Sequence, residues 1–232
     1  MNLFDHLFVL IFAVIYPIAG FIGYRRFLEK IKAGMPANRS RLYIETTSWQ
    51  WVLFALGAIA WGIGDRSFSQ LGMDFELNNW VLIGAALIVM VIGFFFVQIR
   101  QVAKASRKEL QNLESAFGEM SILMPVNGSE LARFNMTSLT AGIVEETLWR
   151  GFLFWYLGHV MPLWGAAIVS AVGFGLAHSY QGLAYIPRVA MIGAVFSGLY
   201  LLTGSLWLSI ILHAVVDLLQ GRLAYEVLRR KD

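Results

Sequence analysis

Apolar residues in this chain gather in seven long stretches that are separated by polar segments. Most of these stretches approach the roughly 20 residues that a helix needs to cross the hydrocarbon core of a bilayer. Open strands would leave backbone groups unpaired in lipid, which favours helices. The pattern therefore predicts an all-α, polytopic membrane protein. The expected spans cover residues 3–24, 48–64, 80–99, 136–157, 162–178, 186–202 and 205–219.

The segment between the third and fourth spans has a mixed pattern. Residues 98–117 combine charges with apolar positions at helical spacing, which predicts a helix that continues out of the membrane or lies on its surface. Residues 120–126 are apolar, but Pro125 and Gly128 interrupt them, so this piece is either a loop or re-entrant. The expected number of spans is therefore seven, or eight with this piece.

Composition supports the same class. Hydrophobic residues make up 58% of the 232 residues and charged residues only 14%, whereas soluble domains carry roughly 25% charge. The mean hydropathy is +0.63. Cysteine is absent, which excludes disulfides, thiol nucleophiles and cysteine ligands to a metal. We expect one membrane domain with an N-terminal three-helix region and its cytoplasmic or interfacial helix (1–135), a four-helix catalytic core (136–220) and a cytoplasmic basic tail (221–232).

Basic residues gather between alternate spans. With the N-terminus outside, sixteen of the 18 Lys and Arg residues fall on the cytoplasmic side, as the positive-inside rule requires. We therefore expect an N-out, C-in topology. This topology also explains the net charge of +3. No basic stripe with interleaved aromatic residues indicates nucleic-acid binding, so the bilayer is the partner that the composition predicts.

Three of the C-terminal spans carry ionisable residues at helical spacing. Such side chains are costly within a bilayer and usually face a protein interior or a water-filled cavity, which makes them candidates for function. Two glutamates, an arginine, two histidines and an aspartate together predict a water-activating site. They are Glu145, Glu146 and Arg150 in the fourth span, His178 at the end of the fifth, and His213 and Asp217 in the seventh.

The fourth span suggests a division of labour between its two glutamates. Glu146 and Arg150 are four residues apart, so they can form an ion pair along one face of a helix. Glu145 points about 100° away from its neighbour. It is left to face a cavity, where a carboxylate suits a general base. The alternative is that all three residues form a structural network that staples helices together.

His213 and Asp217 also lie four residues apart. The aspartate can accept a hydrogen bond from one imidazole nitrogen and leave the other for substrate or metal; the alternative is a self-satisfied pair between helices. Glu145, His178 and His213 could hold zinc or another divalent metal. A metal-free site is equally compatible, with Glu145 as base, His178 orienting the water and His213 stabilising the oxyanion. No His-Glu-x-x-His or Gly-x-Ser-x-Gly motif decides the mechanism.

Three motifs, which follow one another along the fourth, fifth and seventh expected spans, resemble the CAAX protease and bacteriocin-processing family of intramembrane endopeptidases. They are Glu145-Glu146-x-x-x-Arg150, Phe174-x-x-x-His178 and His213-x-x-x-Asp217. This family is also called CPBP or Abi. The resemblance covers about residues 136–220. It implies that Glu145 and His178 activate the attacking water, that His213 and Asp217 stabilise the oxyanion, and that Glu146 and Arg150 support the site.

Two points of the resemblance stay open. Many members have asparagine at the position of Asp217, and a carboxylate cannot donate a hydrogen bond as an amide does. Asp217 therefore either takes part in oxyanion stabilisation or orients His213. Members are often called metalloproteases, but a metal-free glutamate mechanism has also been proposed for the family, so metal dependence is not decided by the resemblance.

The resemblance predicts a peptidase that hydrolyses a bond in a peptide or protein, prenylated or not. The order of the spans places His178 and Asp217 toward the cytoplasmic side, so we expect cleavage at or within the cytoplasmic half of the bilayer. Two other functions remain. One is a non-enzymatic scaffold or bacteriocin-immunity protein with an idle site. The other is a proton-coupled carrier, because Glu, His and Asp within spans also form proton relays; the lack of an internal repeat disfavours it.

Small size and the lack of a targeting signal predict a prokaryotic plasma-membrane protein. No motif identifies a particular substrate. Small-residue patterns such as Gly193-x-x-x-Ser197 do not set an oligomeric state.

Overall fold

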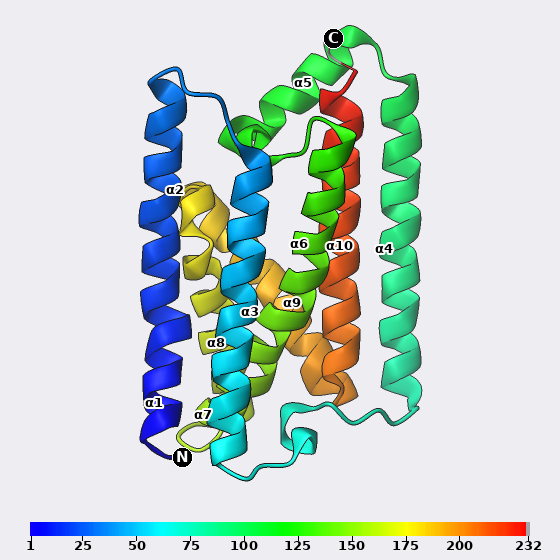
Figure 1. Cartoon of the computed structure of the whole chain (residues 1–232). Coiled ribbons are helices and arrows are strands. Elements are labelled where there is room, and N and C mark those ends of the chain that lie inside the picture. The colour runs from blue at the N-terminus through cyan, green and yellow to red at the C-terminus, as the bar shows by residue number, and fades with distance from the viewer. Residues whose placement is uncertain (231–232) are drawn as a thin grey trace.

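The computed structural model describes residues 1–230, and all regular structure within this range is helical. The prediction of an all-α chain is confirmed for these residues. The two chain ends lie at opposite ends of an elongated bundle (Figure 1). Its helices are α1 (Leu3–Leu10), α2 (Tyr16–Lys32), α3 (Arg39–Ile63), α4 (Asn79–Lys104), α5 (Arg107–Phe117), α6 (Gly128–Glu146), α7 (Leu153–Leu157), α8 (Leu163–Ala177), α9 (Ile186–Thr203) and α10 (Leu206–Leu228).

Short π and 3₁₀ turns join several of these helices. A π turn, η1 (Ile11–Ile15), makes α1 and α2 continuous, and a second π turn, η4 (Thr147–Phe152), joins α6 to α7. With these joins, the described chain contains seven long helical segments in the predicted order. The 3₁₀ turns are η2 (Phe68–Leu71), η3 (Gly118–Leu123), η5 (Ser179–Gln181) and η6 (Leu183–Tyr185).

Several helices are longer than the apolar stretches that predicted them. The first continues past Tyr24 to Lys32, and the last continues past Leu219 to Leu228. Lys, Arg and Glu are good helix formers, so a helix need not end where its apolar residues do. Residues 221–228 of the predicted tail are thus part of α10, and the end of that tail, residues 231–232, lies outside the described residues.

Four helical segments in residues 1–230 are long and apolar enough to cross a membrane. They are Leu3–Lys32, Asn79–Lys104, Leu183–Thr203 and Leu206–Leu228. Helix α8 is apolar but shorter. The apolar piece near Met120 forms the six-residue turn η3, which is too short to cross a bilayer. The predicted count of seven or eight spans and the N-out orientation therefore stay predictions.

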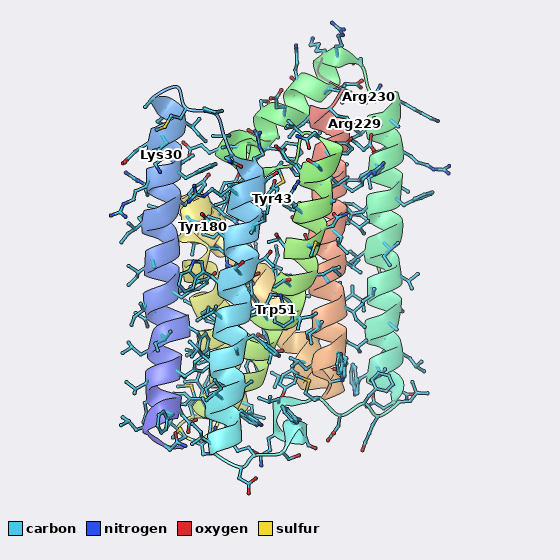
Figure 2. The ribbon with its side chains drawn as sticks, viewed as in Figure 1. Lys30, Tyr43, Trp51, Tyr180, Arg229 and Arg230 are labelled. Carbon is cyan, nitrogen blue, oxygen red and sulfur yellow. The ribbon has the colours of Figure 1, made fainter. Side chains whose placement is uncertain are left out.

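Basic residues mark one end of the bundle. Lys30, Arg229 and Arg230 lie at the end where α5 crosses and the chain finishes, whereas Trp51 lies deeper along α3 (Figures 1 and 2). The opposite end is held by a buried ion pair. Arg66 donates from two nitrogens to the two carboxylate oxygens of Asp5, at 2.8 and 2.7 Å, and its guanidinium stacks 4.1 Å from the Trp155 ring centre.

Helix α6 occupies the centre of the bundle, where it packs against both α3 and α10, while α8 packs against α9. Glycine allows the closest of these approaches. A Cβ at Gly142 would stand 2.9 Å from the Ala214 side chain and 2.9 Å from the Ile210 carbonyl oxygen on α10. A Cβ at Gly175 would stand 2.7 Å from the Ile186 carbonyl oxygen on α9. Both contacts involve backbone, which cannot move aside as a side chain can.

We therefore expect Gly142→Ala to destabilise the protein by about 1–3 kcal/mol, the usual cost of overpacking a tight interface. The matched control is Gly93→Ala on α4, where a Cβ would meet nothing within 4 Å. This control should unfold at or slightly above the wild-type temperature, because alanine is the better helix former. Thermal unfolding in detergent compares the two. Equal unfolding temperatures would contradict the close α6–α10 contact.

Candidate active site

The Glu-Glu-x-x-x-Arg motif lies at a local widening of the central helix. Glu145 and Glu146 are the last residues of α6, and Arg150 lies within the π turn η4. Single π turns inside α-helices occur frequently at functional sites. The two neighbouring carboxylates just before this turn have different surroundings, because adjacent residues on a helix point about 100° apart. Glu146 is fully buried and Glu145 is partly exposed.

Glu146 is the centre of the buried half of the site. Its Oε1 accepts from Arg150 Nη1 at 2.9 Å and from His213 Nδ1 at 2.7 Å. Arg150 Nη2 donates to the Gly193 carbonyl oxygen on α9 at 2.9 Å. The Glu146 and Arg150 side chains are completely shielded from solvent. The ion pair expected from the four-residue spacing is thus present, and it extends to His213 on α10.

Aromatic rings enclose this buried pair. The Arg150 guanidinium lies 4.4 Å from the centre of the Phe174 ring, a distance typical of cation–π contact. The His213 ring stacks on Phe196 with centres 4.9 Å apart and planes 18° apart. Glu146 and Arg150 are thus shielded from bulk solvent. The charges must therefore balance one another, because an unpaired buried charge is very costly.

Glu146, and not Asp217, hydrogen-bonds the His213 ring. A carboxylate only accepts, so Nδ1 of His213 carries the hydrogen that is donated to Glu146. The other nitrogen, Nε2, lies 3.6 Å from Asp217 Oδ2, which is too long for a hydrogen bond. The pairing of His213 with Asp217 considered from sequence is therefore an electrostatic contact, and the ring orientation depends mainly on Glu146.

Glu145 and His178 form the partly exposed half of the site. His178 Nδ1 lies 2.8 Å from the Phe174 carbonyl oxygen, which can only accept, so Nδ1 carries a hydrogen. In the neutral ring Nε2 is then an acceptor, and it lies 3.8 Å from Glu145 Oε2. That oxygen is buried and has no protein partner. The second oxygen, Glu145 Oε1, accepts from Gln50 Nε2 at 2.8 Å.

Phe174 links the two halves. Its ring centre is 4.5 Å from that of His178 and 5.9 Å from that of His213, and it also meets Arg150. The structure thus brings Glu145, Glu146, Arg150, His178, His213 and Asp217 into one cluster, built from α6, η4, α8 and α10.

Two further residues, Tyr180 and Gln50, contact the cluster, although no sequence motif predicted them. Tyr180 in η5 lies beside α2 (Figure 2), has its ring 5.7 Å from that of His178, and interacts electrostatically with Glu145 and Asp217. Burial raises the pKa of Tyr180, so the phenol keeps its proton. Gln50 is a polar residue inside an apolar stretch. Such residues usually face a protein interior or a cavity, and this was the sequence signal that could have identified it.

The predicted metal donors are not arranged as a ligand set. Within residues 1–230, no three His, Asp or Glu side chains are grouped so that they could hold a metal ion. Nδ1 of both His178 and His213 is already hydrogen-bonded, which leaves one nitrogen on each ring. A zinc site needs three protein ligands around one point. Glu145, His178 and His213 do not fit that requirement in this arrangement, and we assign no step to a metal.

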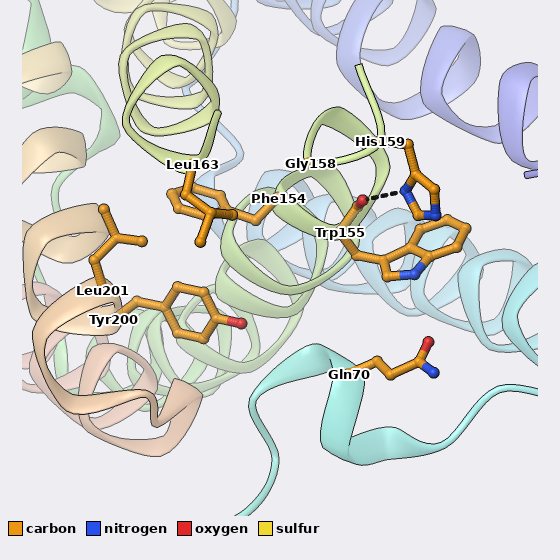
Figure 3. A pocket seen from close by; sticks show the side chains of 8 residues that line it. All are labelled: Gln70, Phe154, Trp155, Gly158, His159, Leu163, Tyr200 and Leu201. Carbon is orange, nitrogen blue, oxygen red and sulfur yellow. Dashed lines mark hydrogen bonds between the residues drawn. The ribbon is translucent and has the colours of Figure 1, made fainter. Parts of the chain in front are cut away.

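A pocket of about 280 Å³ lies away from this cluster. It is lined mainly by aromatic and apolar residues of α7, α8 and α9, with Gln70 and His159 at its edge (Figure 3). None of the six clustered residues lines it. Its size therefore says nothing about the chemistry of Glu145 and His178.

The buried ion pair generates a stability prediction. Arg150→Met should lower the free energy of unfolding by about 3–5 kcal/mol, because it leaves Glu146 buried without its cation. The matched control is Arg41→Met, which removes another i,i+4 arginine–glutamate pair whose side chains are 75% and 51% exposed. Exposed pairs contribute under about 1 kcal/mol. Denaturant unfolding measures both, and similar losses would contradict the shielding of Glu146.

Comparison with known proteins supports the resemblance for part of the chain. Residues 127–219 match the family described as type II CAAX prenyl endopeptidase Rce1-like, whereas no curated protein and no solved structure gave a significant match. This segment begins at the N-cap of α6 and contains all six clustered residues. The resemblance seen in the three motifs is confirmed at the family level. Residues 127–219, about two fifths of the 232-residue chain, are therefore similar to the Rce1-like type II CAAX prenyl endopeptidase family.

Proposed function

We propose that this protein is an intramembrane endopeptidase that hydrolyses a peptide bond with water activated by Glu145 and His178. The observation that carries the proposal is the gap between Glu145 Oε2 and His178 Nε2. Both atoms are acceptors, and at 3.8 Å they are too far apart to bond directly. A water molecule can donate one hydrogen to each of them. Its oxygen lone pair then stays available for attack.

The reaction follows from this placement. As the water oxygen attacks the scissile carbonyl carbon, Glu145 takes a water proton as general base. The carbonyl oxygen becomes an oxyanion. The proton then passes to the amide nitrogen of the leaving segment when the carbon–nitrogen bond breaks. His178 orients the water, and its own orientation is fixed by the Phe174 carbonyl.

His213 is the candidate donor to the oxyanion. Its Nδ1 hydrogen is committed to Glu146, so only Nε2 can face a substrate. The ring stands between two carboxylates, because Asp217 Oδ2 lies 3.6 Å from Nε2. A ring with a proton on both nitrogens would present Nε2–H to the oxyanion, which is the preorganised electrostatic stabilisation that acyl transfer requires. Glu146 holds this donor in place, and Asp217 acts on it through its charge without donating itself.

The family supports a peptide or a prenylated protein as substrate. We further propose seven spans with the N-terminus outside, which places the basic end of the bundle in the cytoplasm. In this topology the substrate reaches the site from the cytoplasmic half of the bilayer. A prokaryotic plasma membrane remains the proposed location.

The first test uses purified protein and a fluorogenic, prenylated CAAX peptide. Glu145→Gln and His178→Ala should each lower kcat at least about a hundredfold, the range lost with a general base, while the protein remains folded. His159→Ala is the matched control, because its Nδ1 also lies 2.8 Å from a carbonyl oxygen four residues earlier, far from the cluster. Full activity of either site variant would overturn the assignment.

The second test concerns metal. We expect cleavage to continue after prolonged treatment with a chelator, with no stoichiometric zinc in the purified protein, because the donors do not converge. Metal analysis and activity are measured on the same sample. Loss of cleavage with chelator and its return with zinc would contradict this, and would require His178, His213 and a carboxylate to rearrange into a ligand set.

A further inference from the structure

Gln50 reaches the candidate site from outside the segment that matches the family. It lies on α3, near the middle of that helix, and only 4% of its surface is exposed. Its amide nitrogen donates to Glu145 Oε1 at 2.8 Å. The family match begins only at residue 127. The general base of the proposed reaction is therefore held by a residue of the N-terminal helices.

The chemistry of the two side chains fixes their relative orientation. A carboxylate accepts hydrogen bonds only, so the NH₂ group of Gln50, and not its oxygen, must face Glu145. This bond occupies Oε1 and leaves Oε2 as the Glu145 oxygen that faces His178. Without it the carboxylate could rotate about its terminal bond, since terminal sp³–sp² torsions are broad. Oε2 would then lose its fixed distance from His178.

We propose that Gln50 is a positioning residue, which orients the Glu145 carboxylate so that Oε2 and His178 Nε2 hold one water between them. The role rests on the proposed function, because it acts through the general base. Positioning matters for rate, since a small displacement of a reacting group costs a large factor in the chemical step. Gln50 should therefore affect kcat more than KM.

A structural role for Gln50 would have a different signature. The same α3–α6 contact contains a second hydrogen bond, between the hydroxyls of Thr47 and Thr137 at 2.9 Å. Thr47 precedes Gln50 by one helical turn, and Thr137 lies two turns before Glu145. Thr47→Val removes this bond without touching Glu145. It is the matched control for simple loosening of α3 against α6.

The experiment measures kcat and KM for Gln50→Met and Thr47→Val on the prenylated CAAX peptide. Gln50→Met keeps the side-chain length but removes the amide. Hydrogen bonds to charged groups are the strong ones, so kcat should fall about ten- to hundredfold with KM unchanged within about twofold. Thr47→Val should keep the wild-type kcat. A wild-type kcat in Gln50→Met, or an equal loss in Thr47→Val, would overturn the positioning role. If Gln50→Met does not fold, Gln50→Asn, whose amide is too short to reach, carries the same test.

An infrared measurement separates this proposal from the proposed function. The carboxylate band of Glu145, identified by its loss in Glu145→Gln, should shift in Gln50→Met and stay unchanged in Thr47→Val. No shift would overturn the positioning role even where the wild-type protein cleaves peptide. If the band shifts in Gln50→Met but the wild-type protein cleaves no peptide, the contact between Gln50 and Glu145 is established. The proposed function is then overturned, and the positioning role with it.

Discussion

The architecture around the cluster depends on one completely buried carboxylate. Glu146 carries a charge that the interior cannot solvate, and it is neutralised by Arg150 on its own helix and bonded by His213 from α10. Arg150 in turn is bonded to the α9 backbone at Gly193. One charge therefore specifies how the central helix, α9 and α10 must be placed relative to each other. A buried ion pair is weak support for stability as such, because desolvation consumes much of its attraction. Its role here is to allow only one arrangement of the helices, since any other leaves a charge unpaired.

The N-terminal helices contact the segment that carries the cluster through specific aromatic interactions. Phe8 and Phe12 pack on Phe152, two residues after the motif arginine, with ring centres 4.9 and 6.3 Å away. The bidentate contact between Asp5 and Arg66 fixes the start of the first helix to the loop after α3. Residues 127–219 thus contain the six clustered residues, while the preceding helices pack against the segment that carries them.

Hydropathy and helical spacing were sufficient to predict the order of the long helices and the ion pair of Glu146 with Arg150, because both depend on residues close in the chain. The partner of His213 could not be predicted in the same way. Asp217, four residues along the chain, was the partner that the spacing suggested. The hydrogen bond is instead made by Glu146, which is 67 residues away in sequence. Such a contact depends on how α6 and α10 pack, and that depends on a glycine at position 142. Gly193 is a second example of a contact that the sequence alone does not reveal. It belongs to a small-residue pattern, but in the structure its small size leaves room for the Arg150 side chain inside the bundle.

Under the proposed peptidase function, the glycine contacts at positions 142 and 175 bear on the kind of peptide segment that could be cleaved. The close contacts of α6 with α10 and of α8 with α9 leave these helices little freedom to close around a substrate bound near Glu145 and His178. The change of conformation on binding must then occur in the substrate. A peptide that crosses lipid as a helix keeps each carbonyl in a hydrogen bond to the residue four positions later, and the surrounding helix shields it from attack by water. A stretch that is already unwound, such as a frayed chain end, exposes a carbonyl at a smaller unfolding cost. Under the proposed function, a rigid site would therefore select substrates by their local disorder as well as by their side chains.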